Sequence, residues 1–204
     1  DETPWQAFKT AAQKTTADSD GDGITDQFGY AFGTGEKWVA LYENVGLLSV
    51  QNDGYFLNEG LTKSTVNSPE IKEAFEFFVG LHEAGVAPKE SVTLTDQTIY
   101  WNMFNEGKVA TFMGGHWAMD WLESQEPVAP YGLTLTKKKQ IGSSTGGWIL
   151  AMSSHTEKRE SVWNFMEYMF KPNNLIKFTS IMPATKAAND LVMKEDRYRL
   201  YKKV

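Results

Sequence analysis

An acidic loop close to the amino terminus has the residue types and the spacing of a cation site. Between Asp18 and Asp26 carboxylates recur at alternate positions, and Gly23 permits the sharp turn that wraps such a loop around an ion. Oxygen ligands at this spacing favour Ca²⁺ and match the opening positions of an EF-hand loop. Six residues are the candidate ligands, Ile24 through its carbonyl oxygen: Asp18, Asp20, Asp22, Ile24, Asp26 and Gln27.

The loop departs from the EF-hand pattern at its last position, where Gly29 stands in place of a bidentate Glu. We therefore predict a structural Ca²⁺ and no sensor role. The alternative is a turn stabilised by its Asp and Gly residues without a metal. Carboxylates this close repel one another when no cation is bound, which favours the metal site.

Tryptophans at the ends of predicted elements form a second candidate site. Flat aromatic rings stack on the C–H faces of sugars, while polar neighbours orient the hydroxyl groups. Trp117 and Trp148 each follow two glycines, which let a ligand approach the backbone closely, and Trp38 lies in the first turn of a predicted helix. The alternative for each ring is the core, which helical spacing predicts for three others: Trp5, Trp121 and Trp163.

Catalytic patterns are weak. The three histidines are far apart in sequence and lack metal-ligand or HExxH spacing, so His116 has no triad partner in reach. Glu123 and Glu126 are interpreted as solvated charges at a helix end, with a glycosidase pair as the alternative. We predict no catalytic residue, and we expect a protein that is not an enzyme.

Composition narrows the class of protein. The 204 residues are 41% hydrophobic, enough for an apolar core, and the net charge of −6 opposes binding to nucleic acids. Cysteine is absent, which excludes disulfides, thiolate zinc sites and cysteine nucleophiles. The sequence begins at Asp1 and ends in a charged stretch, so we expect a mature or truncated fragment.

Helix and strand patterns alternate along the chain, which predicts an α/β class. Helix starts are indicated by Thr3 with Pro4, by Ser68 with Pro69, by Thr156 and by Pro172. The predicted helices start at Pro4, span residues 36–48, 69–84 and 96–106, and begin at Trp117, after Thr156 and at Pro172; the predicted strands span residues 109–113, 131–135 and 148–152.

Seven stretches, taken in order, resemble the extracellular solute-binding proteins of ABC sugar importers, which include maltose- and oligosaccharide-binding proteins. They are TPWQAFKTAAQK, DSDGDGITDQFGYAF, PEIKEAFEFFVGLHEAGVAP, FNEGKVATFMGGHWAMDWL, YGLTL, STGGWILAMSSHTEKRESVWNFMEYMF and MPATKAA. The resemblance implies a periplasmic-binding-protein-like (type II) lobe, a mixed sheet flanked by helices, with the first lobe largely missing. Residues 1–146 would form the second lobe with the calcium loop 18–27, and residues 147–204 the crossing strand and the helices that return to the first lobe.

The same resemblance implies a subunit that captures a sugar or oligosaccharide outside the cytoplasm and delivers it to a membrane permease. A periplasmic or lipoprotein location follows, and a missing first lobe or a second chain would cover the apolar stripe of Val162, Phe165 and Met169. Capture by this chain alone should then be weak or absent. The implied ligand-binding residues are the three rings and their neighbours: Glu36, Trp38, Gly115, His116, Trp117, Asp120, Gly147 and Trp148.

Two other classes of function remain open at this point. Calcium loops and exposed tryptophans also suit a calcium-stabilised carbohydrate-active enzyme or a carbohydrate-binding module. A third possibility is a structural fragment that binds no ligand. Turnover of a sugar would identify the enzyme, and tryptophan fluorescence that no ligand changes would identify the structural fragment.

Overall fold

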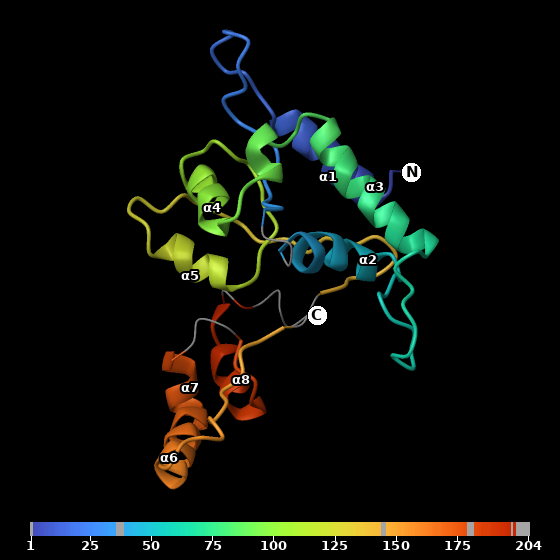
Figure 1. Cartoon of the computed structure of the whole chain (residues 1–204). Helices are drawn as coiled ribbons and strands as arrows, with labels where there is room; N and C mark the ends of the chain where they lie inside the picture. Colours follow the sequence, from blue (N-terminus) through green and yellow to red (C-terminus); the bar gives the residue numbers. More distant parts are fainter. Residues whose placement is uncertain (1, 36–38, 144–145, 179–181, 197, 199–204) are drawn as a thin grey trace. The chain divides into compact units, whose positions relative to one another are not determined.

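The computed structural model describes residues 2–35, 39–143, 146–178, 182–196 and 198. The chain folds as two compact units, Asp1–Ser144 and Thr145–Val204 (Figure 1). Helices make up most of the regular structure in the described residues. Within that part of the chain no helix has both the length and the apolar composition that a membrane crossing requires.

Two helix starts in the first unit, at Thr3 and Ser68, are those predicted, and Asp96 caps a third helix for which only the range 96–106 was predicted. Thr3 caps α1, Ser68 caps α3 and Asp96 caps α4, each with a side-chain oxygen that accepts a backbone N–H of the first turn. The predicted helix 36–48 is divided into a π-helical segment and an α-helix that ends three residues later, and its first three residues lie outside the described ranges. The helices of this unit are α1 Pro4–Thr15, η1 Val39–Gly46, α2 Leu47–Gln51, α3 Pro69–Glu83, η2 Lys89–Val92, α4 Gln97–Asn105 and α5 Trp117–Glu123.

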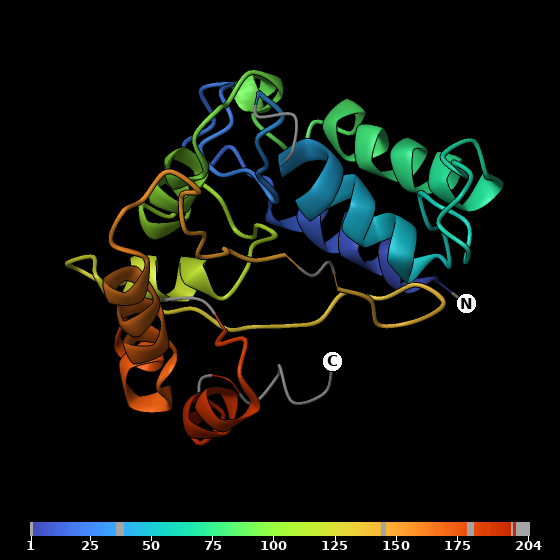
Figure 2. The same ribbon diagram turned by 60° about the horizontal axis from the view of Figure 1, so that its bottom comes forward.

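Helices α1, α2 and α3 lie close together (Figures 1 and 2), and an aromatic core holds them. Trp5 of α1 stacks on Phe77 of α3 with 4.8 Å between ring centroids and is 4% exposed, so its predicted core position is confirmed. Phe32 packs against Phe78 of α3 with 4.7 Å between ring centroids. Leu48 of α2 is fully buried in the same cluster. Apolar side chains of α1, α2 and α3 therefore share one core.

Two segments, 28–31 and 108–112, pair as parallel strands over a short length. The Phe28 N–H donates to the Lys108 carbonyl at 2.9 Å, and the Ala110 N–H donates to the Phe28 carbonyl at 2.8 Å. Bridges join Phe28 to Val109 and Ala31 to Phe112 in one register. The segment 28–31 is also bonded to other parts of the unit: the Tyr30 N–H donates to the Val86 carbonyl at 3.0 Å, and the Gly29 N–H donates to the Thr16 hydroxyl at 2.9 Å.

The predicted mixed sheet does not appear in the described residues, which contain isolated bridges and no extended strand. Only the predicted strand 109–113 has a partner segment, and that pairing covers four residues. Residues 131–135 and 148–152 have no bridge partner, so their backbones run as irregular chain. A strand is defined by a neighbouring backbone, and an alternating sequence cannot supply that neighbour by itself.

The described residues of the second unit form three α-helices: α6 Arg159–Phe170, α7 Pro172–Phe178 and α8 Lys186–Val192. Pro172 begins α7 as predicted. The predicted cap at Thr156 is wrong, because α6 starts after Lys158. The Thr156 hydroxyl instead accepts the Lys158 N–H at 3.3 Å, two residues along the chain, which is a turn outside the helix. Trp163, for which helical spacing predicted a core position, is 54% exposed on α6.

Candidate functional site

Trp117 begins α5 one residue after the pair Gly114 and Gly115, shortly beyond the paired segment 109–112. A Cβ atom on Gly115 would lie 2.1 Å from the Trp117 ring, so the indole rests on the Gly115 backbone. The position of the Trp117 ring thus leaves no room for a side chain at residue 115, whether or not a ligand is bound. The half-buried ring packs on a second hydrophobic cluster that includes Tyr100, Trp101 and Val109. One part of the ring is fixed in the core and another part remains accessible.

A chain of hydrogen bonds holds the polar edge of this ring. Trp117 Nε1 donates to Gln97 Oε1 at 3.3 Å, and Gln97 Nε2 donates to Glu43 Oε2 at 2.9 Å. Gln97 is the first residue of α4, and Glu43 lies in η1. Glu43 is 7% exposed, and its Oε1 has no partner among the described residues. Burial raises the pKa of Glu43, and the hydrogen bond from Gln97 opposes that rise.

Sequence reasoning missed both Gln97 and Glu43. Glu43 is the single carboxylate in the apolar stretch 38–48, and an unpaired charge in a buried stripe indicates a polar function or a buried hydrogen bond. Gln97 directly follows the Asp96 cap, which fixes its position in space, but nothing in the sequence names its partner. Glu43 could have been found as a polar residue in an apolar stretch, whereas no sequence signal identified Gln97.

The predicted ligand-binding residues fall into three groups. Gly115, His116, Trp117 and Asp120 come together at the start of α5, where the His116 ring meets the Trp117 ring edge-on at 5.5 Å. Gly147 and Trp148 belong to the second unit, and Trp148 is 89% exposed there. Glu36 and Trp38 lie outside the described residues.

The acidic loop brings three of its predicted ligands together. Carboxylate oxygens of Asp18, Asp20 and Asp22 lie within 4.8 Å of one another and are exposed. Gly21 and Gly23 adopt left-handed backbone angles, with φ of 79° and 86°, which only glycine takes without strain. The loop therefore has the alternating carboxylates and the turn geometry predicted from the sequence.

Two of the other predicted ligands, Asp26 and Gln27, have protein partners. Asp26 accepts hydrogen bonds from the Ser19 backbone N–H at 2.7 Å and from its hydroxyl, and these lower the pKa of Asp26. Gln27 donates its side-chain amide to the Thr15 carbonyl at 2.8 Å. Backbone N–H groups of Gly23 and Gly21 also lower the pKa of Asp18. These bonds are the ones that a turn without a metal would use, so both interpretations of the loop keep a structural basis.

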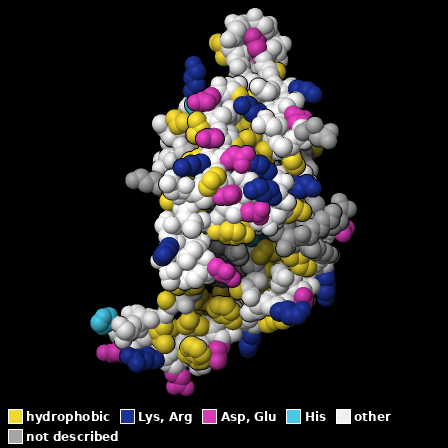
Figure 3. Space-filling model, turned by 90° about the vertical axis from the view of Figure 1, so that its right-hand side faces the viewer, with side chains coloured by type: hydrophobic (Ala, Val, Ile, Leu, Met, Phe, Trp, Pro, Cys, Tyr) yellow, Lys and Arg dark blue, Asp and Glu magenta, His cyan; other side chains and the backbone are white. Residues whose placement is uncertain are grey.

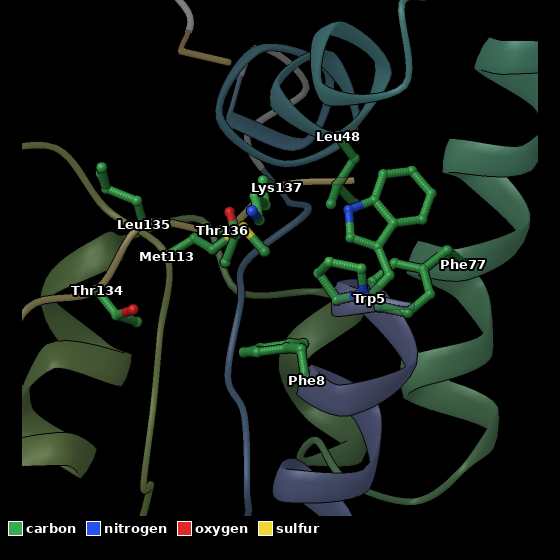
Figure 4. A pocket seen from close by; sticks show the side chains of 10 residues that line it. Trp5, Phe8, Leu48, Phe77, Met113, Thr134, Leu135, Thr136 and Lys137 are labelled. Carbon is green, nitrogen blue, oxygen red and sulfur yellow. The ribbon is translucent and has the colours of Figure 1, made fainter. Parts of the chain in front are cut away.

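A cavity of about 220 Å³ opens beside the first hydrophobic core (Figure 4). Trp5 and Phe77 form one side of it, and the chain from Thr134 to Lys137 forms another (Figure 4). The Trp5 indole donates its N–H to Gln51 Oε1 at 3.1 Å, so its polar atom is already paired. The lining contains none of the residues predicted to bind a ligand or a metal.

Comparison with known proteins identifies the family. The family model of the bacterial extracellular solute-binding proteins matches residues 3–198. The chain belongs to this family. No functionally curated protein matches the chain significantly. The family is extracellular, and the resemblance stated from the sequence is confirmed.

Solved structures of solute-binding proteins share the fold of this chain. One from Thermotoga lettingae, bound to α-D-tagatose, superposes with a TM-score of 0.76 at 21% identity, over 97% of this chain and 50% of that one. A maltose/maltodextrin-binding domain from Bdellovibrio bacteriovorus, bound to maltotriose, has a TM-score of 0.68 at 20% identity, over 96% and 50%. One from Agrobacterium radiobacter, in complex with ribitol, has a TM-score of 0.74 at 19% identity, over 100% and 52%.

These solute-binding proteins are periplasmic-binding-protein-like (type II) structures, which confirms that part of the predicted fold. The mixed sheet expected within it is not shown, as described above. The chain spans about half the length of the solved structures that it matches.

Proposed function

We propose that this chain is part of the substrate-binding subunit of an ABC-type importer, which captures a sugar or oligosaccharide outside the cytoplasm and delivers it to a membrane permease. Family membership supports a solute-binding role. The ligands named with three structural relatives are a sugar, an oligosaccharide and a sugar alcohol, so a polyhydroxylated ligand is the one to test first. In the intact protein this role implies a periplasmic or lipoprotein location.

The observation that supports sugar binding most strongly is the half-buried Trp117 ring at a glycine turn. An aromatic ring fixed by core contacts and a hydrogen bond can offer an accessible part to the C–H face of a sugar without losing conformational entropy on binding. His116 and Asp120 lie next to it and supply polar groups for hydroxyls. Trp38, Glu36, Trp148 and Gly147 stay predicted ligand-binding residues on the sequence alone.

Calorimetric titration of the intact protein with maltotriose, maltose, α-D-tagatose and ribitol tests the proposal. Trp117→Ala should abolish binding of whichever ligand the wild type takes, while the melting temperature shows that the fold remains. Trp163→Ala is the matched control, because this exposed ring lies on α6 and is not part of the proposed site. Unchanged affinity in Trp117→Ala would refute the role of this ring.

We also propose that the loop 18–27 holds a structural Ca²⁺. The clustered oxygens of Asp18, Asp20 and Asp22 support this, because three carboxylates this close gain stability from a bound cation. Excess EGTA should lower the melting temperature, and added Ca²⁺ should restore it while Mg²⁺ does not. Identical melting curves with and without chelator would establish the turn without a metal.

A carbohydrate-active enzyme is the competing function, and Glu123 and Glu126 are its candidate carboxylate pair. Glu123 accepts a hydrogen bond from the Tyr131 hydroxyl at 2.7 Å, an interaction that suits a structural charge equally well. Products that form from a sugar panel and disappear in Glu123→Gln or Glu126→Gln would favour the enzyme. Recovery of every bound sugar unchanged would favour transport.

The apolar face of the second unit is proposed to contact another lobe or a second chain. Hydrophobic side chains gather on this face (Figure 3). Of the predicted stripe, Phe165 is 57% exposed, whereas Met169 is buried within the unit. Exposed apolar patches of this kind usually mark interaction surfaces. Phe165→Asp should then weaken the contact between this face and the lobe or chain that covers it. Analytical ultracentrifugation of the intact protein measures contact with a second chain, and limited proteolysis measures contact with another lobe.

A further inference from the structure

We propose that Gln97 and Glu43 are positioning residues that fix the orientation of the Trp117 ring. The inference rests on the proposed function in one respect, namely that Trp117 is a surface for ligand stacking. Neither residue belongs to a sugar-contacting motif of the sequence, and both lie in helices, Glu43 in η1 and Gln97 in α4. Their effect on a ligand would pass through the orientation of the indole.

The chemistry of the three groups allows one arrangement of the Gln97 amide. An indole N–H can only donate, so the group that faces Trp117 must be the amide oxygen. An ionised carboxylate can only accept, and a protonated one keeps an accepting oxygen, so the amide nitrogen faces Glu43. The observed distances of 3.3 Å and 2.9 Å agree with this direction of the chain. Glu43 therefore selects the amide orientation that Trp117 needs.

Glu43 is held firmly enough to serve as the anchor. It lies in the π-helical segment Val39–Gly46, a helix form that occurs frequently at functional sites. Gly46 ends this segment, and a Cβ there would lie 2.5 Å from the Leu41 carbonyl oxygen, so the local backbone is closely packed. The Glu43 side chain is buried near Tyr100. Burial raises the pKa of Tyr100, and the negative charges of Glu43 and Asp96 raise it further.

A buried carboxylate with one unsatisfied oxygen is costly to stability, and this cost points to a role other than stabilising the fold. An apolar side chain of similar length would pack here without that cost. The feature that such a side chain would lack is an acceptor for Gln97 Nε2. The acceptor matters because, without it, the amide can rotate and the Trp117 N–H loses its partner.

Indole N–H resonances of the uniformly ¹⁵N-labelled chain provide the test, with the Trp117 signal assigned by its loss in Trp117→Phe. Glu43→Gln keeps an accepting oxygen, and Glu43→Met removes it at nearly equal length. We expect Glu43→Gln to leave the Trp117 signal in place. Glu43→Met and Gln97→Met should shift the signal toward that of a solvated indole and accelerate its exchange with water. The Trp5 signal, bonded to Gln51 in the other cluster, should stay unchanged in all variants.

The outcomes separate this inference from the proposed function. If Glu43→Met does not fold, Gln97→Met gives the same measurement at a half-buried position. A Trp117 signal unaffected by Gln97→Met, or shifted equally by Glu43→Gln and Glu43→Met, would overturn the inference. A second arm titrates the intact protein with the sugar panel, where Gln97→Met should weaken binding by about three- to tenfold, the value of one hydrogen bond. Equal affinity of Gln97→Met and the wild type would overturn the role of ring positioning in ligand binding. If the wild type binds no sugar of the panel, the proposed function is overturned, and the indole spectra alone test whether Gln97 and Glu43 position the ring.

Discussion

Gly29 lies where the carboxyl end of α1 meets the paired segment 28–31. A Cβ atom added at this position would lie 1.9 Å from the Ala12 carbonyl oxygen and 2.5 Å from its carbonyl carbon. These are backbone atoms, so no rotation of a side chain can relieve the clash. Ordinary contact begins at 3.4 Å, and α1 would have to withdraw by about 1.5 Å for Gly29→Ala to fit.

That withdrawal would also break a hydrogen-bonded junction. The Gly29 N–H donates to the Thr16 hydroxyl at 2.9 Å, and this hydroxyl donates to the Ala12 carbonyl at 2.8 Å. Overpacking costs about 1–3 kcal/mol and the lost hydrogen bond about 1 kcal/mol, which gives a destabilisation of about 2–4 kcal/mol. For a unit of this size the melting temperature should fall by roughly 5–15 °C.

Differential scanning calorimetry of Gly29→Ala measures this fall. Gly132→Ala is the matched control, because a Cβ there meets no atom within 4 Å, and it should melt like the wild type. A Gly29→Ala protein that melts within about 1 °C of the wild type would refute the close packing of α1 on this segment. The same result would argue against the observed pairing of segment 28–31 with segment 109–112, because the hydrogen bonds at Thr16 help to hold segment 28–31 in place.

Two further predictions concern buried polar groups. Trp5→Phe keeps the stacking on Phe77 but leaves Gln51 Oε1 without its donor, so the free energy of unfolding measured in urea should fall by about 1–3 kcal/mol. Trp163→Phe, at an exposed position, should change it by less than about 0.5 kcal/mol. Equal effects of the two substitutions would contradict the buried hydrogen bond. Because burial raises the pKa of Glu43 above its ordinary 4.5, the unfolded chain ionises first and stability should decline as pH rises from that value through the raised pKa. Glu43→Gln should remove this decline, and a variant with the same pH dependence as the wild type would contradict the assignment.

Local sequence features predicted the helix starts well, because a cap is made within one turn. Thr3 and Ser68 each need only a backbone N–H three residues further along the chain to act. Thr156 has the same side chain chemistry, but its hydroxyl closes a turn before the helix begins. Propensity alone does not distinguish these two uses of a threonine.

Long-range partners were beyond the sequence. Gln51 accepts from Trp5, and its amide donates to Thr136 at 2.7 Å across 85 positions of the chain, a contact that no spacing rule contains. The strand predicted at 131–135 lies beside this contact without a bridge partner. For the site, the glycine turn singled out Trp117, but the groups that hold its indole come from two other helices.

The central claim is that the protein binds a sugar without transforming it. The most direct measurement is calorimetric titration of the intact protein with the sugar panel, followed by chromatography of the recovered ligand. We predict saturable binding of at least one sugar, recovery of that sugar unchanged, and loss of the signal in Trp117→Ala. Hydrolysis products, or binding that persists in Trp117→Ala with the fold intact, would contradict it.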